Sequence, residues 1–175
     1  TKSLVRELVV SSAYRLRTGE SSSLDPDNRL LTHANRRRLD AESLRDSVLS
    51  VSGQLDPKMG GSTIRKYSTY DYGYAFKSNR RSLYVPRFRG IRLEIFDVFD
   101  AADPNLVTGR RATSQVSTQA LYLMNNPWLM NQADHAAKRL LQSVDQNLDQ
   151  LLDRAYTLSL GRLPASEERR LAVAF

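Results

Sequence analysis

Hydrophobic residues recur three and four positions apart along most of the chain. This spacing places apolar side chains on one face of an α-helix and leaves polar side chains on the opposite face. We therefore predict a mainly α-helical fold. The segments that carry the pattern are residues 2–16, 40–55, 91–99, 117–124, 127–141, 145–160 and 166–174.

Several residues predict where these helices begin and end. Asp40, Asn126 and Asp145 precede helical segments and have side chains that accept hydrogen bonds from free backbone N–H groups at a helix start. Pro127 suits the first helical position, because its ring presets the backbone and it has no N–H to leave unpaired. Gly161 follows a helical segment and is a favoured stop residue.

The middle of the chain follows a different pattern. Tyr70, Tyr72 and Tyr74 alternate with smaller or polar residues, which is typical of a strand, and residues 82–85 could form the returning strand. The fold class we predict is thus mainly α, an irregular helical domain with a small inserted β-hairpin. We expect residues 1–175 to form a single domain. The expected core residues are Leu44, Val48, Val51, Ile95, Phe99, Leu121, Leu123, Leu140, Leu151, Leu152 and Leu158.

Composition excludes several classes of chemistry. The chain has no cysteine and two histidines, so disulfides, thiolate zinc sites and cysteine nucleophiles are excluded, and little remains for a histidine-based metal site. No apolar stretch approaches the ~18 residues that a membrane span needs. The sequence contains no Gly-rich phosphate loop, Gly-x-Ser-x-Gly elbow or His-Glu-x-x-His motif. We expect no catalytic residue, no metal and no cofactor.

The net charge of +7 comes from arginine, since five of the 26 basic residues are lysines and the other 21 are arginines. Arginine binds carboxylates and phosphates through a planar fork, so this excess favours fixed ion pairs or oxyanion binding. A basic balance of this size also places nucleic acid, anionic polysaccharide and acidic membrane surfaces among the conceivable partners. The 19 acidic residues could instead pair with most of the arginines.

The strongest candidate for a binding surface combines aromatic and basic residues. Tyr70, Tyr72 and Tyr74 would share one strand face, where exposed rings stack on sugars or on bases. Arginines that could hold anionic groups follow, and the candidates are Arg80, Arg81, Arg87, Arg110 and Arg111. In the competing interpretation the tyrosines are half-buried against a helix and the arginines pair with carboxylates.

Three aspartates suggest the alternative of an enzyme. Asp97, Asp100 and Asp103 are three positions apart, so a helix would place them along one face. Glycoside hydrolysis requires two carboxyl groups across a sugar. Asp97 and Asp100 would more often pair with nearby arginines such as Arg110 and Arg111 than act in catalysis.

Several segments together resemble a known family. They are DPDNRLL (25–31), RRRLDAE (36–42), RRSLYV (80–85), FDAADP (99–104), Arg110-Arg111 and STQALYLMNNP (117–127). These residues are similar to the first planctomycete-specific domain family, a domain of unknown function, and the likeness covers nearly the whole chain. The resemblance implies the later part of a longer domain, in exported or periplasmic proteins that also carry a cytochrome-like companion domain. Any haem would belong to that companion, because this chain lacks Cys-x-x-Cys-His.

The function that we expect is that of a non-catalytic binding or positioning module of an exported multidomain protein, with polysaccharide as its partner. One alternative is a glycan-active enzyme fragment that uses the aspartates. Another is a basic domain that binds nucleic acid, although the implied export argues against it. Nucleic-acid binding would weaken steeply with salt, because counterions are released.

Overall fold

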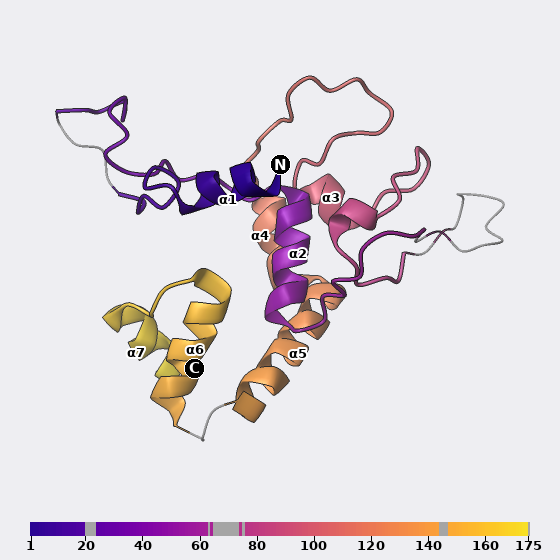
Figure 1. Cartoon of the computed structure of the whole chain (residues 1–175). Helices are drawn as coiled ribbons and strands as arrows, with labels where there is room; N and C mark the ends of the chain where they lie inside the picture. The colour runs from indigo at the N-terminus through magenta and orange to yellow at the C-terminus, as the bar shows by residue number, and fades with distance from the viewer. Residues whose placement is uncertain (20–23, 63, 65–73, 75, 144–146, 175) are drawn as a thin grey trace. The chain divides into compact units, whose positions relative to one another are not determined.

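The structure is a computed structural model, and it describes residues 1–19, 24–62, 64, 74, 76–143 and 147–174 (Figure 1). The described chain is mainly helical, as the hydrophobic spacing predicts. By its internal contacts it divides into two compact units, Thr1–Arg38 and Leu39–Phe175, which are described separately below. No helix of the described residues is long and apolar enough to cross a membrane.

The first unit combines helix α1 (Lys2–Val10) with a loop ordered by two buried polar residues. The Asp25 carboxylate accepts hydrogen bonds from the backbone N–H groups of Arg29 and Leu30, both at 2.8 Å. Asn28 adopts a left-handed backbone with φ 50° and donates from Nδ2 to the carbonyl of His33 at 2.7 Å. Asparagine tolerates this conformation better than most residues, so the turn fits its sequence.

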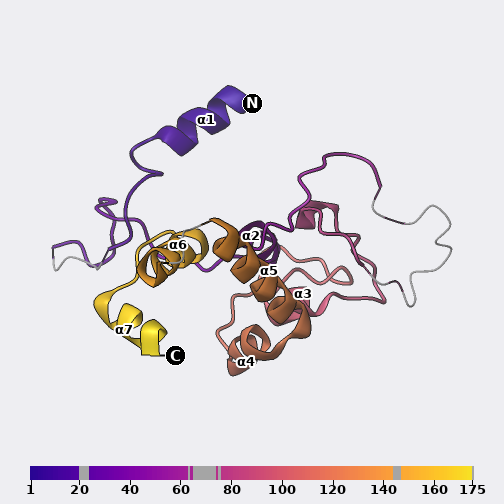
Figure 2. The ribbon, with the colours of Figure 1, turned by 90° about the horizontal axis from the view of Figure 1, so that it is seen from below.

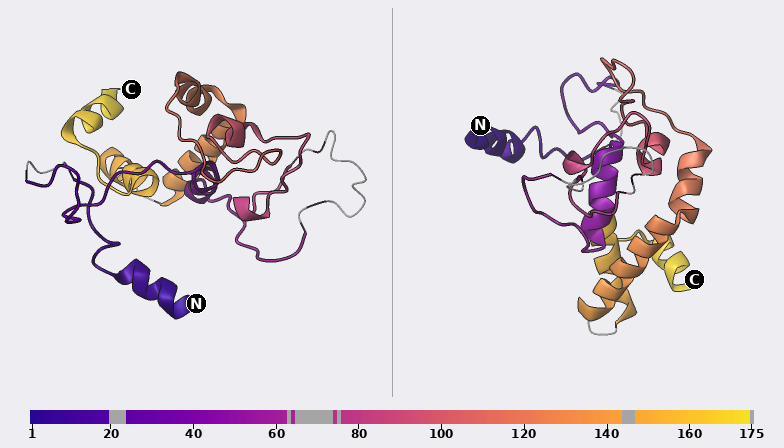
Figure 3. Two further views of the ribbon diagram at one scale, coloured as in Figure 1. Left: turned by 90° about the horizontal axis from the view of Figure 1, so that it is seen from above. Right: turned by 90° about the vertical axis from the view of Figure 1, so that its right-hand side faces the viewer.

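The second unit places short helices around a small core. Helix α2 contacts η1, α3 and α5, and α4 contacts α3 and α5, whereas α6 contacts α5 and α7 (Figures 2 and 3). The elements are α2 (Ala41–Val51), η1 (Ser82–Tyr84), α3 (Glu94–Val98), α4 (Ser117–Asn125), α5 (Pro127–Ser143), α6 (Leu148–Leu160) and α7 (Ser166–Ala174).

The core of this unit is smaller than the predicted one. It comprises Ala41, Val85, Ile95, Phe96, Phe99 and Tyr122. Ile95 and Phe99 were thus placed correctly, and Leu44 packs against the cluster. The remaining predicted residues outside α4 are only half-buried, and they are Val48, Val51, Leu140, Leu151, Leu152 and Leu158.

Helix α4 turns a different face inward from the one predicted. Leu121 and Leu123 are 56% and 39% exposed, so their assignment to the core is wrong. Gln119 and Tyr122 are buried in their place. The Gln119 amide is accommodated because Nε2 donates to the Val98 carbonyl at 3.0 Å and to Ser114 Oγ at 3.1 Å.

The predicted β-hairpin is also not found, since the structure has no strand among the residues it describes. Tyr70 and Tyr72 lie outside the described residues. Ser82–Tyr84, predicted as the returning strand, is instead the 3₁₀ turn η1. Its first N–H donates to Asp46 Oδ1 at 2.7 Å, as does the Ser82 hydroxyl. A carboxylate on α2 therefore takes the bond that a partner strand would have made.

Local signals for helix ends were more reliable. Asp40 caps α2 by accepting from the Ser43 N–H at 2.7 Å, and Gly161 ends α6 with φ 69°. Asp145 lies outside the described residues, and Asn147 caps α6 by accepting from the Asp149 N–H.

A distant helix adds hydrogen bonds to the C-terminal end of α2. Arg139 of α5 donates from Nη1 to the carbonyl of Ser50 at 2.9 Å and to that of Val51 at 3.0 Å. Gly53 adopts φ 73°, and a Cβ there would stand 3.2 Å from Arg139 Cδ. The Ser50 carbonyl also accepts from the Gly53 N–H at 3.1 Å and the Leu49 carbonyl from the Gln54 N–H at 2.9 Å, so the arginine adds to a local cap rather than replacing one.

Candidate functional site

A pocket of about 360 Å³ lies within the second unit, between α2, α3, α4, the start of α5 and residues 76–79. Its volume falls at the small end of the range of about 300–1,000 Å³ typical of ligand sites. Aromatic rings and polar groups share the lining. The lining residues are Arg45, Phe76, Lys77, Ser78, Asn79, Leu93, Glu94, Ile95, Tyr122, Asn126 and Trp128.

Asn126 positions one wall of this pocket. It caps α5, as its sequence position predicts, because Oδ1 accepts from the N–H groups of Trp128 at 3.0 Å and Leu129 at 3.3 Å. Its Nδ2 donates to Glu94 Oε2 at 2.8 Å. One amide side chain therefore sets the start of the helix that carries Trp128 and orients the carboxylate of α3.

Arg45 positions the opposite wall. Arg45 is only 4% exposed. It donates from Nη2 to the Ser78 carbonyl at 2.8 Å and from Nη1 to the Arg80 carbonyl at 2.9 Å. Nη1 also lies 3.3 Å from Ser82 Oγ, and the guanidinium lies 5.5 Å from the centre of the Phe76 ring. Arg45 thus helps to hold against α2 the chain segment that carries four pocket residues, Phe76, Lys77, Ser78 and Asn79.

The buried position of Arg45 is unusual for an arginine, whose charge favours the solvent-exposed face of a helix. Arg45 and Leu49 face inward, and Leu49 is fully buried. A guanidinium can occupy such a position only where its charge and N–H groups have partners. Asp46 Oδ1 lies 3.6 Å from Nη1, and the carbonyls supply the other contacts.

Four polar groups of the pocket lining form no hydrogen bond or ion pair with any residue that the structure describes. They are the Lys77 ammonium, the Asn79 amide, the Tyr122 hydroxyl and the Trp128 indole N–H. Tyr122 is 9% exposed, yet no fully buried side-chain N or O atom of the described residues lacks a partner. The Tyr122 hydroxyl is therefore not fully buried, and Tyr122 is one of the residues that line the pocket.

The pocket lining carries charged groups of both signs. Burial, followed by the negative charge of Glu94, raises the pKa of Tyr122 to about 12, so this phenol stays protonated and can donate a hydrogen bond. Arg45 and Lys77 also line the pocket. The described lining residues therefore combine one carboxylate with two cations.

The predicted tyrosine surface is only partly described. Tyr74 is half-buried and packs edge-to-face on Phe88, with ring centres 5.1 Å apart. Arg80 is buried, donates to the carbonyls of Lys58 and Gly60, and stacks on Tyr84 at 4.0 Å. The interpretation of half-buried tyrosines and internally bonded arginines therefore describes Tyr74 and Arg80 better than the exposed platform does.

The other predicted arginines do not gather at one place. Arg87 donates to the Ala102 carbonyl at 2.8 Å and lies over the Phe96 ring. Arg111 pairs with Glu42 at 2.7 Å. The remaining two, Arg81 and Arg110, are exposed and form no side-chain hydrogen bond or ion pair with a described residue.

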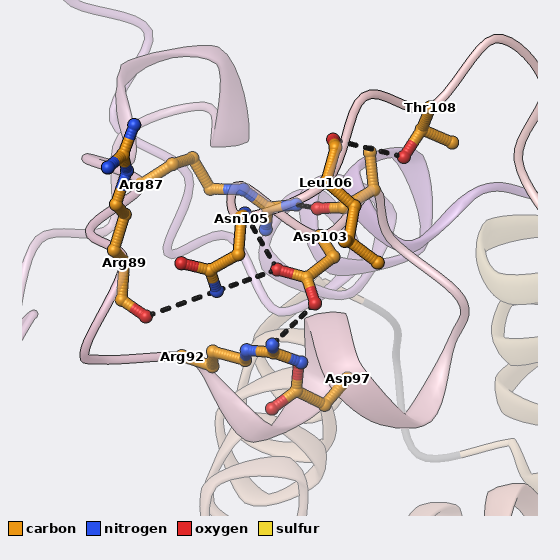
Figure 4. Close-up of polar contacts among 9 residues, drawn as sticks. Arg87, Arg89, Arg92, Asp97, Asp103, Asn105, Leu106 and Thr108 are labelled. Atoms are coloured by element: carbon orange, nitrogen blue, oxygen red, sulfur yellow. Dashed lines mark hydrogen bonds and ion pairs between the residues drawn. The ribbon is translucent and has the colours of Figure 1, made fainter.

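The three candidate aspartates are engaged with neighbouring residues. Arg92 lies 3.5 Å from Asp97 and 2.6 Å from Asp103 (Figure 4). The N–H of Asn105, together with Arg92, holds the pKa of Asp103 below its usual value, which opposes a role as general acid. Asp100 adopts φ 58° and accepts from the N–H and hydroxyl of Ser114 at 2.7 and 2.8 Å.

Sequence reasoning missed the pocket. Phe76, Tyr122 and Trp128 lie on separate segments, and nothing in their spacing predicts that they meet. The one available signal was the single tryptophan two positions after an Asn-Pro helix start. Within the described ranges no group of three or more His, Cys, Asp or Glu side chains could hold a metal ion.

Comparison with known proteins gives one match. The model of the PSD1 family, described as "Protein of unknown function (DUF1553)", matches residues 1–175. No curated protein and no solved structure matches the chain.

Proposed function

Since this chain belongs to the PSD1 family, whose function is unknown, we propose a role from its pocket: the domain is a non-catalytic module that binds a carbohydrate chain. In this proposal it belongs to an exported multidomain protein and positions a polysaccharide beside a cytochrome-like companion domain, as the family resemblance implies. The observation that carries the binding role is the set of four unpaired polar groups within an aromatic pocket.

The chemistry of the lining suits a sugar ring. A pyranose has apolar C–H faces and a rim of hydroxyl groups, so it needs flat apolar surfaces and hydrogen-bonding groups around them. Phe76, Tyr122 and Trp128 supply the rings, while Asn79 and the indole N–H supply unused hydrogen-bonding groups. Pockets of this kind combine an apolar lining with a few placed polar groups.

Binding is better supported than hydrolysis. Among the described lining residues Glu94 is the only carboxylate, whereas glycoside hydrolysis generally needs two. Asp97 and Asp103 share Arg92 and line other surfaces. Nucleic-acid binding is less well supported for a related reason, because Arg80, Arg87 and Arg111 are engaged within the protein.

Titration calorimetry against a panel of neutral and acidic oligosaccharides tests the proposal. Trp128 is the only tryptophan, so quenching of its fluorescence by the same ligands reports binding at this pocket. We expect Trp128→Ala and Asn79→Ala each to weaken binding by about tenfold, which corresponds to about 1.4 kcal/mol. The matched control is Tyr14→Ala, which removes an exposed ring in the first unit.

Two results would contradict the proposal. One is ligand binding that is unchanged by both pocket variants, and the other is the absence of binding to every oligosaccharide in the panel. Trp128 packs against the core, so its variant needs a check of folding by circular dichroism. Asn79→Ala avoids this difficulty, because the Asn79 side chain bonds to no described residue.

A further inference from the structure

We propose that the sugar bound in this pocket is acidic, a uronic acid whose carboxylate lies against the wall formed by Arg45 and Lys77. This inference rests on the proposed carbohydrate-binding function and narrows it to one substrate class. It is carried by the uneven distribution of charge around the pocket and by the unused donors of the cationic wall.

Arg45 has bonding capacity left on the pocket side. A guanidinium carries five N–H donors, and the hydrogen bonds of Arg45 leave from Nη1 and Nη2 alone. Nε donates to no described residue. Since no fully buried side-chain N or O atom of the described residues lacks a partner, Nε must be partly accessible to solvent. Since Arg45 is 4% exposed and lines the pocket, a ligand in the pocket is the accessible partner for that donor.

The charge of Arg45 is also incompletely balanced. Burial lowers its pKa, and the nearby carboxylate of Asp46 offsets this effect only in part. Asp46 accepts hydrogen bonds from the N–H and the hydroxyl of Ser82 as well, so its charge is shared. A second anion on the pocket side would stabilise the buried guanidinium further.

Lys77 adds a second cation to the pocket lining. Its side chain is exposed and pairs with no described carboxylate, although the chain has 19 acidic residues. The opposite wall carries Glu94, whose Oε2 accepts from Asn126 and which also suits hydroxyl donors. A uronic acid matches both walls, since it carries one carboxylate and several hydroxyl groups on a single ring. A neutral sugar would leave the cationic wall without a partner.

The experiment compares each acidic oligosaccharide with its methyl ester, which lacks the negative charge. Oligogalacturonate and oligoglucuronate are each titrated beside their methyl esters, with the complete chain in the calorimeter. We expect each acid to bind about tenfold more tightly than its ester, because a charge-assisted contact is lost on esterification. Lys77→Gln should remove most of that difference and leave the affinity for the ester unchanged. Lys58→Gln, a change at another exposed lysine, should alter neither.

The outcomes separate the two proposals. Equal affinity for acid and ester, or binding of neutral oligosaccharides alone, overturns the acidic-sugar inference and leaves the carbohydrate pocket in place. A loss of acid binding that is equal in Lys77→Gln and Lys58→Gln also overturns it, because attraction would then come from net charge. Binding of no ligand in the panel overturns the proposed function together with the inference.

Discussion

Replacing Arg45 with lysine tests whether one guanidinium holds the pocket wall against α2. The variant keeps the positive charge but loses the planar fork that reaches both Ser78 and Arg80. A hydrogen bond from a charged donor contributes about 1.5–3 kcal/mol, and a buried acceptor left unpaired costs about 1–3 kcal/mol. With at least one of the two carbonyls unpaired, we expect the free energy of unfolding to fall by about 3 kcal/mol.

Urea denaturation followed by Trp128 fluorescence measures this loss, since the single tryptophan lies in the same pocket. For a chain of this size about 3 kcal/mol corresponds to a decrease in Tm of about 6–12 °C. Arg81→Lys is the matched control, because Arg81 is exposed and its side chain bonds to no described residue. A loss below about 1 kcal/mol in Arg45→Lys would refute the reasoning, since the carbonyls would then have found other partners.

Two further substitutions and one pH titration test other parts of the second unit. Asp40→Ala removes the cap of α2 and should lower the free energy of unfolding by about 1 kcal/mol in urea denaturation, and an unchanged midpoint would contradict the cap. Leu49→Ala should lower it by about 2–5 kcal/mol, because the side chain is fully buried, and a loss under 1 kcal/mol would contradict that burial. Hydrogen bonds from Arg162 and from the Ala165 N–H lower the pKa of Glu168 to about 2. Its contribution to stability is therefore complete above the ordinary value of 4.5 and is lost as pH falls toward 2, and an NMR titration midpoint near 4.5 would contradict the pairing.

Helix ends could be predicted from the sequence because their causes are local. Asp40 bonds to an N–H three positions away, Asn126 to one two positions away, and Gly161 needs only its own backbone freedom. The same holds for the predominance of helix, which follows from the spacing of apolar residues. None of these features depends on which distant segments meet.

The candidate site depends on distant segments, which explains why its residues were missed. Arg45 is buried because carbonyls 33 and 35 positions away surround it, and hydropathy assigns any arginine to the surface. Gln119 enters the core because Val98, 21 positions away, accepts its N–H. Neither partner can be identified without knowing how the chain folds back.

The tyrosine prediction also missed the aromatic pocket, because the rings that line the pocket are far apart in the sequence. Alternating aromatics were the visible signal, but the described rings that form a pocket come from residues 76, 122 and 128. The expected returning strand failed for a comparable reason, since Asp46 of α2 binds the first N–H of Ser82–Tyr84. A pattern of alternation carries no information about a carboxylate 36 positions earlier in the chain.

The contact between Arg139 and the end of α2 has a consequence for how the chain folds. The donor lies 89 positions after the Ser50 carbonyl, so these two bonds form only when α5 docks, whereas the local bonds from the Gly53 N–H to Ser50 and from the Gln54 N–H to Leu49 need no other helix. Closing a loop of this length costs chain entropy before any contact compensates for it, and such distant pairings slow folding. The amides of α2 and α5 should therefore gain protection from hydrogen exchange in one kinetic step.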